Sequence, residues 1–193
     1  RKHEWLPHQG DSVPSDLRGQ TTVIVGTGHI GSLIAQMLQG FGVRTIGVRR
    51  RAAPTQNFDE IQPLAGVDSL LPKCDWLVLA CPLTPDTRGL MNTQRFAMLP
   101  RHAGFINVSR GAVVDEAALI HALANGRLKG AYLDVFAVEP LPAESPLWHL
   151  PNVIISPHDA TASTGNYARG VELFLRNLNA YLRGEALENE IQF

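Results

Sequence analysis

The stretch TVIVGTGHIG, residues 22–31, decides the fold of this chain. Its first four residues are all β-branched, which predicts a short strand that ends at Gly26. A strand that passes through a glycine-rich turn directly into a helix is typical of an open α/β sheet. The helix is indicated by apolar residues that recur with the spacing of one helix face, at Ile30, Leu33, Ile34, Met37 and Leu38.

The same alternation of apolar strands and helices continues along the rest of the chain. The sequence predicts strands over Thr22–Val25, Arg44–Val48, Trp76–Ala80, Gly104–Val108, Gly130–Leu133 and Val153–Ile155. It predicts helices over Ile30–Gln39, Asn92–Met98, Asp115–Asn125 and Thr164–Arg183. The proline-containing stretch 50–64 is expected to be irregular. Because the strands are apolar throughout, we expect an α/β fold with a doubly wound parallel sheet of about six strands.

The composition is that of an ordinary folded protein and excludes several classes. The chain has 193 residues, with 17 Lys and Arg against 18 Asp and Glu and a hydrophobic fraction of 45%. This balance argues against a disordered chain and gives no positive field for nucleic acid or an anionic membrane. No apolar run approaches the roughly 20 residues of a membrane helix. We therefore expect no nucleic-acid partner and no membrane partner. Cys74 and Cys81 form no zinc motif and no disulfide framework, so we expect no metal and a reducing, cytoplasmic location.

Residues 26–31 read GxGxxG and follow a predicted strand, which is the context that gives this motif its meaning. Gly26 permits a tight turn, Gly28 lets the backbone approach a pyrophosphate, and Gly31 lets helix and strand pack closely. The helix that begins at His29 and Ile30 offers amide groups and the positive end of its dipole to phosphates. The motif therefore predicts a Rossmann-type dinucleotide site. The alternative is a glycine-rich turn without a ligand.

An arginine run follows the second predicted strand, at Arg49, Arg50 and Arg51. Sites that prefer NAD usually carry Asp or Glu about 20 residues beyond the glycine motif, to bind the ribose 2′-hydroxyl. Arg49 lies 21 positions beyond Gly28, where that acid is expected. A guanidinium holds a 2′-phosphate through charge-assisted hydrogen bonds. We therefore expect NADP as the cofactor, with NAD as the alternative. The arginine run could instead be a solvent-exposed basic turn that does not contact the cofactor.

Three polar groups follow three different predicted strands. Arg110 comes after one strand, Asp134 and Glu139 come after the next, and His158 follows the last. Since ligands bind beyond the carboxyl ends of parallel strands, we expect these groups to converge there. An arginine grips a carboxylate, and a histidine paired with an acid moves a proton to or from an oxygen. Together they predict reduction of a 2-keto acid. The alternatives are a surface charge at Arg110, a turn residue at Glu139 and a structural histidine.

Four segments together resemble one known family: VGTGHIG, INVSRGAVVDEAAL, YLDVFAVEP and PLWHLPNVIISPH. They resemble the D-isomer-specific 2-hydroxyacid dehydrogenases, and the likeness covers nearly the whole chain. By this resemblance Arg110 is the substrate-binding catalytic arginine, His158 is the catalytic acid and base, and Glu139 pairs with it. Asp159 departs from the apolar residue that often follows the histidine in this family.

The same resemblance implies further contacts to the cofactor. Asp134 matches the residue that contacts the nicotinamide carboxamide. The loop on the adenosine and ribose side corresponds to Cys81, Pro82 and Thr87. The backbone beside the nicotinamide corresponds to Val108 and Ser109. The family also implies a small 2-keto or 2-hydroxy acid as substrate and a homodimer formed through the cofactor domain.

Family members carry a flavodoxin-like substrate domain, mostly before the glycine motif, and only about 20 residues precede the motif here. We therefore expect residues 21–184 to form the dinucleotide-binding domain of a larger enzyme. Residues 1–20 would be a remnant of the interdomain linker, and residues 185–193 would return toward the substrate domain. Such a chain alone would bind the dinucleotide without turnover. Two other functions stay open: a corepressor-like sensor of dinucleotides and an NAD-linked phosphoglycerate-type dehydrogenase.

Overall fold

The structure is a computed structural model, which describes residues 14–53 and 55–190. The chain divides into two compact units, residues 1–157 and 158–193, and each is described by itself. The expected linker remnant therefore lies mostly outside the described residues, as do the last three residues of the expected returning segment.

In the described part of the first unit, seven parallel strands form one sheet. They are β1 (Thr21–Val25), β2 (Arg44–Arg49), β3 (Glu60–Pro63), β4 (Trp76–Leu79), β5 (Gly104–Asn107), β6 (Gly130–Leu133) and β7 (Val153–Ile155). Their order across the sheet is β3-β2-β1-β4-β5-β6-β7. The strand order reverses between β1 and β4, and ligands bind in the crevice beyond the carboxyl ends of such a pair. The predicted doubly wound parallel sheet is confirmed.

The sheet holds one strand more than the sequence predicts. This strand, β3, lies within the stretch 50–64 that was expected to be irregular, and it pairs with β2 from Ile46↔Glu60 to Arg49↔Pro63. It is an edge strand, so it has a neighbour on one side only and does not need an apolar sequence. Glu60 and Gln62 therefore give no signal of a buried strand.

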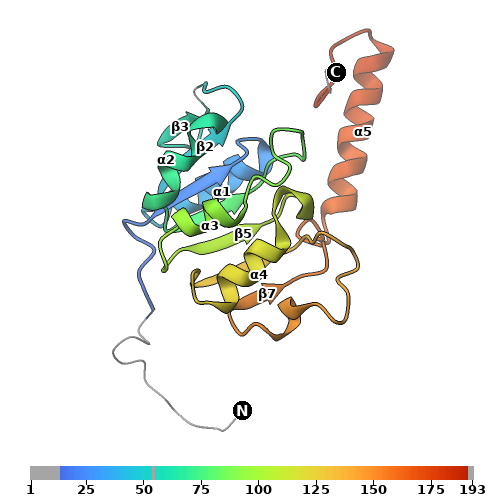
Figure 1. Ribbon diagram of the computed structural model, residues 1–193. Helices are drawn as coiled ribbons and strands as arrows, with labels where there is room; N and C mark the ends of the chain where they lie inside the picture. Colours follow the sequence, from blue (N-terminus) through green and yellow to red (C-terminus); the bar gives the residue numbers. More distant parts are fainter. Residues whose placement is uncertain (1–13, 54, 191–193) are drawn as a thin grey trace, which may run out of the picture. The chain divides into compact units, whose positions relative to one another are not determined.

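Helices cover both faces of the sheet (Figure 1). One face carries α1 (His29–Gln39), and the other carries α2 (Val67–Leu70), α3 (Thr93–Met98) and α4 (Glu116–Ala124). Alternate strand residues serve the two layers, because successive side chains of a strand point to opposite faces. Ile24 and Val78 pack on the α1 side with Ala35. The larger core on the other side includes Val23, Val25, Leu77, Leu79, Phe105, Leu133, Phe96 and Leu119.

Two of the predicted helices begin one residue later than expected, because the expected first residue is the cap. The Asn92 side chain accepts a hydrogen bond from the Arg95 amide at 3.0 Å, at the start of α3. The Asp115 carboxylate accepts one from the Ala118 amide at 3.1 Å, at the start of α4. Each cap satisfies an amide that the helix itself leaves without a partner.

The second unit consists of α5 (Asn166–Leu182) and a segment that folds back along it. The chain leaves the helix through Gly184, whose φ of +67° suits glycine at a helix end. Arg176 and Glu188 then form an ion pair at 2.7 Å. The Asn177 side chain bonds the backbone of Glu188 through both its oxygen and its nitrogen, at 2.8 and 3.0 Å.

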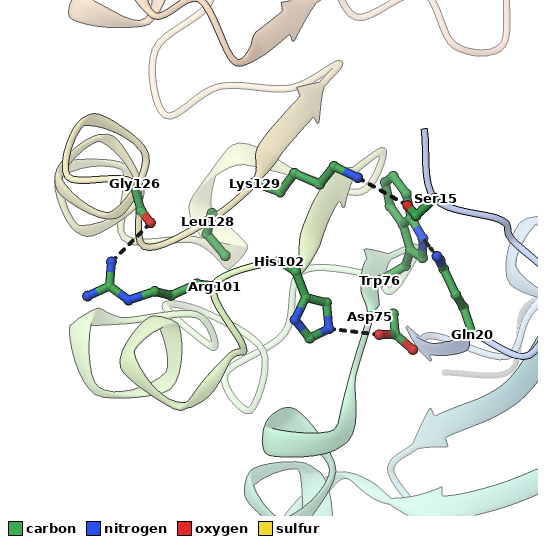
Figure 2. A pocket seen from close by; sticks show the side chains of 9 residues that line it. All are labelled: Ser15, Gln20, Asp75, Trp76, Arg101, His102, Gly126, Leu128 and Lys129. Carbon is green, nitrogen blue, oxygen red and sulfur yellow. Dashed lines mark hydrogen bonds and ion pairs between the residues drawn. The ribbon is translucent and has the colours of Figure 1, made fainter. Parts of the chain in front are cut away.

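Asp75 fastens the amino-terminal ends of three strands. Its carboxylate accepts a hydrogen bond from the Thr21 amide at 2.7 Å. The same carboxylate lies 2.8 Å from Nε2 of His102 (Figure 2). Its own backbone amide donates to the Thr21 carbonyl, and its carbonyl accepts from Gly104, both at 2.9 Å. The starts of β1, β4 and β5 therefore meet at this one residue.

We predict that Asp75→Ala lowers the free energy of unfolding by about 1–3 kcal/mol, since it leaves a half-buried amide without its acceptor. Asp68 provides the matched control, because its ion pair with Arg95, at 2.6 Å, lies at the surface. Asp68→Ala should cost less than about 1 kcal/mol. Urea unfolding of both variants checks the prediction, and an equal loss in the two would contradict it.

Candidate functional site

The glycine turn at the end of β1 lies at the reversal point of the sheet. The Gly26 amide donates to the Val48 carbonyl at 2.8 Å, which joins the turn to the end of β2. Gly26 has a φ of +104°, and a Cβ built on it would stand 2.4 Å from the Ala80 carbonyl oxygen. Only glycine fits this position, because it tolerates positive φ and brings no side chain. The turn is thereby held between the ends of β2 and β4.

Gly31 and Gly28 differ in the space around them. A Cβ on Gly31 would stand 1.9 Å from the Gly26 carbonyl oxygen, so helix α1 packs directly on the turn. A Cβ on Gly28 would meet no atom within 4 Å. Gly28 is the residue before the first turn of α1, where helix amides have no partner within the helix. The geometry therefore presents a helix start with open space in front of it, which suits a pyrophosphate.

One cavity of about 540 Å³ joins the glycine turn to two other predicted groups. It is lined by Val25, Gly26, Thr27, Gly28, Val48, Arg49, Arg50, Arg51, Leu64, Ala80, Cys81, Pro82, Thr84, Asp86 and Thr87. The structure thus brings together the glycine turn, the arginine run and the loop after β4. His29 and Ile30 lie at the start of α1, next to this lining. The cavity has the wall chemistry that a dinucleotide needs, with amides for phosphate at one end and guanidinium groups at the other.

Sequence reasoning missed seven residues of the lining: Val25, Thr27, Val48, Leu64, Ala80, Thr84 and Asp86. Leu64 follows the edge strand β3, which the sequence did not reveal. Thr84 and Asp86 belong to a loop whose shape depends on Thr87. The Thr87 hydroxyl donates to the Pro82 carbonyl at 2.7 Å and accepts from the Thr84 amide at 2.8 Å. Thr87 therefore shapes the cavity wall from a nearly buried position.

The two cysteines are buried and unreactive in character. Burial raises the pKa of the Cys81 thiol to about 11 and that of the Cys74 thiol to about 12. Both thiols are therefore neutral near pH 7 and act as small apolar groups. Cys81 contributes an apolar patch to the cavity wall, whereas Cys74 belongs to the core.

The arginine run is exposed at the end of β2, and Arg49 is held by a neighbour. Its Nη1 donates to the Thr55 hydroxyl at 2.9 Å, and that hydroxyl donates to the Ala53 carbonyl at 3.2 Å. The segment after β2 therefore orients one guanidinium beside the cavity. Arg50 and Arg51 add positive charge to the same wall.

The loops after β5 and β6 lie against each other in the first unit. A Cβ on Gly111 would stand 1.8 Å from the Phe136 carbonyl oxygen, so the loop that carries Arg110 touches the loop that leads to Glu139. The Glu139 carboxylate accepts a hydrogen bond from the Phe136 amide at 2.9 Å. Ser109, which is 4% exposed, donates its hydroxyl proton to the Asn107 side chain at 2.7 Å. Val108 follows β5 and donates its amide to Leu79 at 3.1 Å.

Asp134 follows β6 directly and is 2% exposed. The Ser156 hydroxyl, at the end of β7, donates to its carboxylate at 2.6 Å. The sequence analysis named Asp134 as a candidate site residue and did not name Ser156. The signal was present, because the serine follows the last strand and so shares the sheet edge with Asp134.

His158 is the first residue of the second unit, with a φ of +55°. Its predicted convergence with Arg110 and Glu139 therefore stays a prediction. Within the first unit, the structure places the loop of Arg110 against the loop of Glu139.

A second cavity, of about 400 Å³, lies at the amino-terminal ends of the strands (Figure 2). Its polar lining groups bond to one another or to nearby backbone. Lys129 reaches Ser15 at 3.3 Å, Arg101 donates to the Gly126 carbonyl at 3.3 Å, and the Trp76 indole donates to Gln20 at 2.6 Å. These bonds fasten the chain before β1 to the rest of the unit, and we assign this cavity a structural role.

Two features are absent from the described residues. Within residues 14–53 and 55–190, no group of three or more His, Cys, Asp or Glu side chains lies close enough to hold a metal ion. Over the same ranges, no helix combines the length and the apolar character that crossing a membrane requires.

Comparison with known proteins identifies the family. Residues 1–160 match the family described as D-isomer specific 2-hydroxyacid dehydrogenase, NAD binding domain. A glyoxylate reductase of Korarchaeum cryptofilum is 39% identical over 177 residues, which are 90% of this chain and 52% of that protein. The chain spans about half the length of the curated relatives that it matches.

Solved structures give the same result. A D-isomer specific 2-hydroxyacid dehydrogenase from Xanthobacter autotrophicus Py2, in complex with NADPH and MES, is 38% identical with a TM-score of 0.84. The match covers 93% of this chain and 74% of that one. An NADPH-dependent glyoxylate/hydroxypyruvate reductase from Sinorhizobium meliloti, in complex with NADP and sulfate, is 35% identical with a TM-score of 0.85. This match covers 99% of this chain and 60% of that one.

The glycine turn at the sheet reversal, the cavity beside it and these matches agree with one another. The chain belongs to the D-isomer specific 2-hydroxyacid dehydrogenase family, and residues 1–160 correspond to its domain for binding a nicotinamide dinucleotide.

Proposed function

We propose that this chain binds NADP(H) and forms the cofactor half of an enzyme that interconverts 2-keto acids and D-2-hydroxy acids. The observation that carries the proposal is the single cavity shared by the glycine turn and the arginine run. Bound there, the dinucleotide supplies a hydride from its reduced nicotinamide. The chain itself supplies the backbone amides that bind the pyrophosphate and the arginine side chains that bind the 2′-phosphate of the adenosine half.

The preference for NADP rests on charge at the end of β2. Arg49, Arg50 and Arg51 line the cavity, and the acid that an NAD site would place near position 49 is replaced by a guanidinium. A guanidinium forms forked, charge-assisted bonds with a phosphate and gains less from a neutral ribose hydroxyl. The complexes of the two structural relatives named above, with NADPH and with NADP, support the same preference.

The proposed chemistry assigns roles to groups at the far ends of β5, β6 and β7. Arg110 would grip the substrate carboxylate and polarise the neighbouring carbonyl. His158 would give a proton to the carbonyl oxygen as it becomes an alcohol, and Glu139 would favour the charged form of that histidine. Asp134 would bind the nicotinamide amide. The named activity of the relatives supports glyoxylate or hydroxypyruvate as substrate.

We predict that Arg49→Ala weakens NADPH binding about tenfold or more and changes NADH binding less than about twofold, because it removes a charge-assisted bond to the 2′-phosphate. Arg44→Ala is the control, since Arg44 starts the same strand, pairs with Glu60 at 2.6 Å and lies outside the cavity lining. Calorimetric titration of both variants with both dinucleotides measures the effect. Equal losses for NADPH and NADH would contradict the assignment.

We predict that Gly28→Ala separates binding from stability. The added Cβ meets no protein atom within 4 Å, so the free energy of unfolding should change by less than about 1 kcal/mol. The same Cβ stands where the pyrophosphate approaches, so dinucleotide affinity should fall about tenfold or more. Gly170→Ala, in α5, is the control with equally open surroundings and should leave affinity unchanged. Unchanged affinity in Gly28→Ala would place the pyrophosphate elsewhere.

Turnover tests the reaction itself. NADPH oxidation should be measured with glyoxylate, hydroxypyruvate and phenylpyruvate, using the 193-residue chain and any longer protein that contains it. We expect tight dinucleotide binding by the chain and turnover by the longer protein. Binding by both with turnover by neither would favour a dinucleotide sensor.

A further inference from the structure

Two hydroxyl groups connect β6 and β7 to the buried carboxylate of Asp134. The Tyr132 hydroxyl lies 2.7 Å from the Ser156 hydroxyl, and the Ser156 hydroxyl donates to Oδ1 of Asp134 at 2.6 Å. Tyr132 belongs to β6 and pairs in register with Ile154 of β7. Its ring therefore spans from the middle of one strand to the end of the next. Neither residue has a role in the proposed reaction so far.

The direction of this chain of hydrogen bonds is fixed by the number of protons. A serine hydroxyl carries one proton, and here that proton goes to the carboxylate. The Ser156 oxygen therefore accepts the proton of Tyr132. Both hydroxyl groups point their donors toward Asp134, which is the arrangement that stabilises and orients a carboxylate.

Asp134 lies where such support matters. It is 2% exposed, it directly follows β6, and its backbone amide donates to the Asn107 carbonyl at 3.1 Å. The backbone thus fixes where the residue stands, and the Ser156 hydroxyl contributes to how its carboxylate is turned. A buried acid that loses a hydrogen-bond donor is costly to keep in place.

We propose that Ser156 and Tyr132 are positioning residues that hold Asp134 ready for the nicotinamide amide. This inference rests on the proposed function, because it takes Asp134 as the group that faces that amide. A carboxylate fixed beforehand costs less conformational entropy when the amide donor binds. The two hydroxyl groups of Tyr132 and Ser156, here called the hydroxyl relay, therefore contribute to affinity for the nicotinamide half of the cofactor and not to affinity for the adenosine half.

The test compares whole dinucleotides with their adenosine halves. The 193-residue chain and its Ser156→Ala variant are titrated with NADPH and with adenosine 2′,5′-bisphosphate, and then with NADH and with ADP. In both pairs the second ligand lacks the nicotinamide, so the comparison does not depend on the preference for the 2′-phosphate. We predict that Ser156→Ala loses about tenfold in affinity for the whole dinucleotide, since the buried Asp134 carboxylate loses a hydrogen-bond donor. Affinity for the adenosine half should stay within about twofold of the parent chain.

Three further variants show whether the hydroxyl relay is the cause. Ser156→Thr keeps the hydroxyl and should retain affinity. Tyr132→Phe removes only the outer hydroxyl and should lose about two- to fivefold, for the whole dinucleotide alone. Ser69→Ala removes a serine hydroxyl that bonds the Gly66 carbonyl at 2.8 Å on the exposed surface, and it should change nothing.

Each other outcome overturns the inference in a distinguishable way. Equal affinities in the parent chain and Ser156→Ala would remove the relay while leaving the proposed cofactor site intact. Equal losses for the dinucleotide and its adenosine half would make the hydroxyl pair a structural link between β6 and β7. Failure of the parent chain to bind any of the four ligands would overturn the proposed function together with the relay.

Discussion

The rest of the structure depends on the contact between Gly31 and the Gly26 carbonyl oxygen. A Cβ at Gly31 would stand 1.9 Å from that oxygen, so helix α1 can pack on the glycine turn only without a side chain there. This contact brings the first turn of α1 to the end of β1, at the point where the strand order reverses. The first amides of the helix then lie beside the open space at Gly28, which is the arrangement that binds phosphate in proteins and on which the proposed function rests.

The parallel arrangement of the strands places further groups beside the glycine turn, at the carboxyl ends of the strands. Because all the strands in the described residues run the same way, the groups that follow them meet at one edge. The arginine run after β2 joins the cavity of the glycine turn, and the loops of Arg110 and Glu139 touch through Gly111 and Phe136. The amino-terminal ends of the strands are joined by hydrogen bonds such as those of Asp75, and the polar groups that line the cavity there bond to one another or to nearby backbone. The proposed ligand-binding residues and the bonds of Asp75 therefore lie at opposite ends of the same strands.

The sequence predicts most of this fold because its signals are local. Continuous apolar runs mark the central strands, glycines mark the turn, and Asn92 and Asp115 mark two helix starts. Strand β3 escaped prediction because an edge strand with Glu60 and Gln62 has no apolar pattern. Leu64 was missed because it follows β3. Ser156 follows a predicted strand but was missed because its bond to Asp134 joins two residues that are distant in the chain. The role of His158 stays a prediction, because it depends on placement that lies beyond the first unit.

The most direct test of the account is a crystal structure of this chain with bound NADPH. We expect the pyrophosphate at the amides of the turn 26–31, the 2′-phosphate at Arg49 or Arg50, and the nicotinamide beside Asp134. A dinucleotide bound with its pyrophosphate away from Gly28, or with its 2′-phosphate turned from the arginine run into solvent, would contradict the central claim.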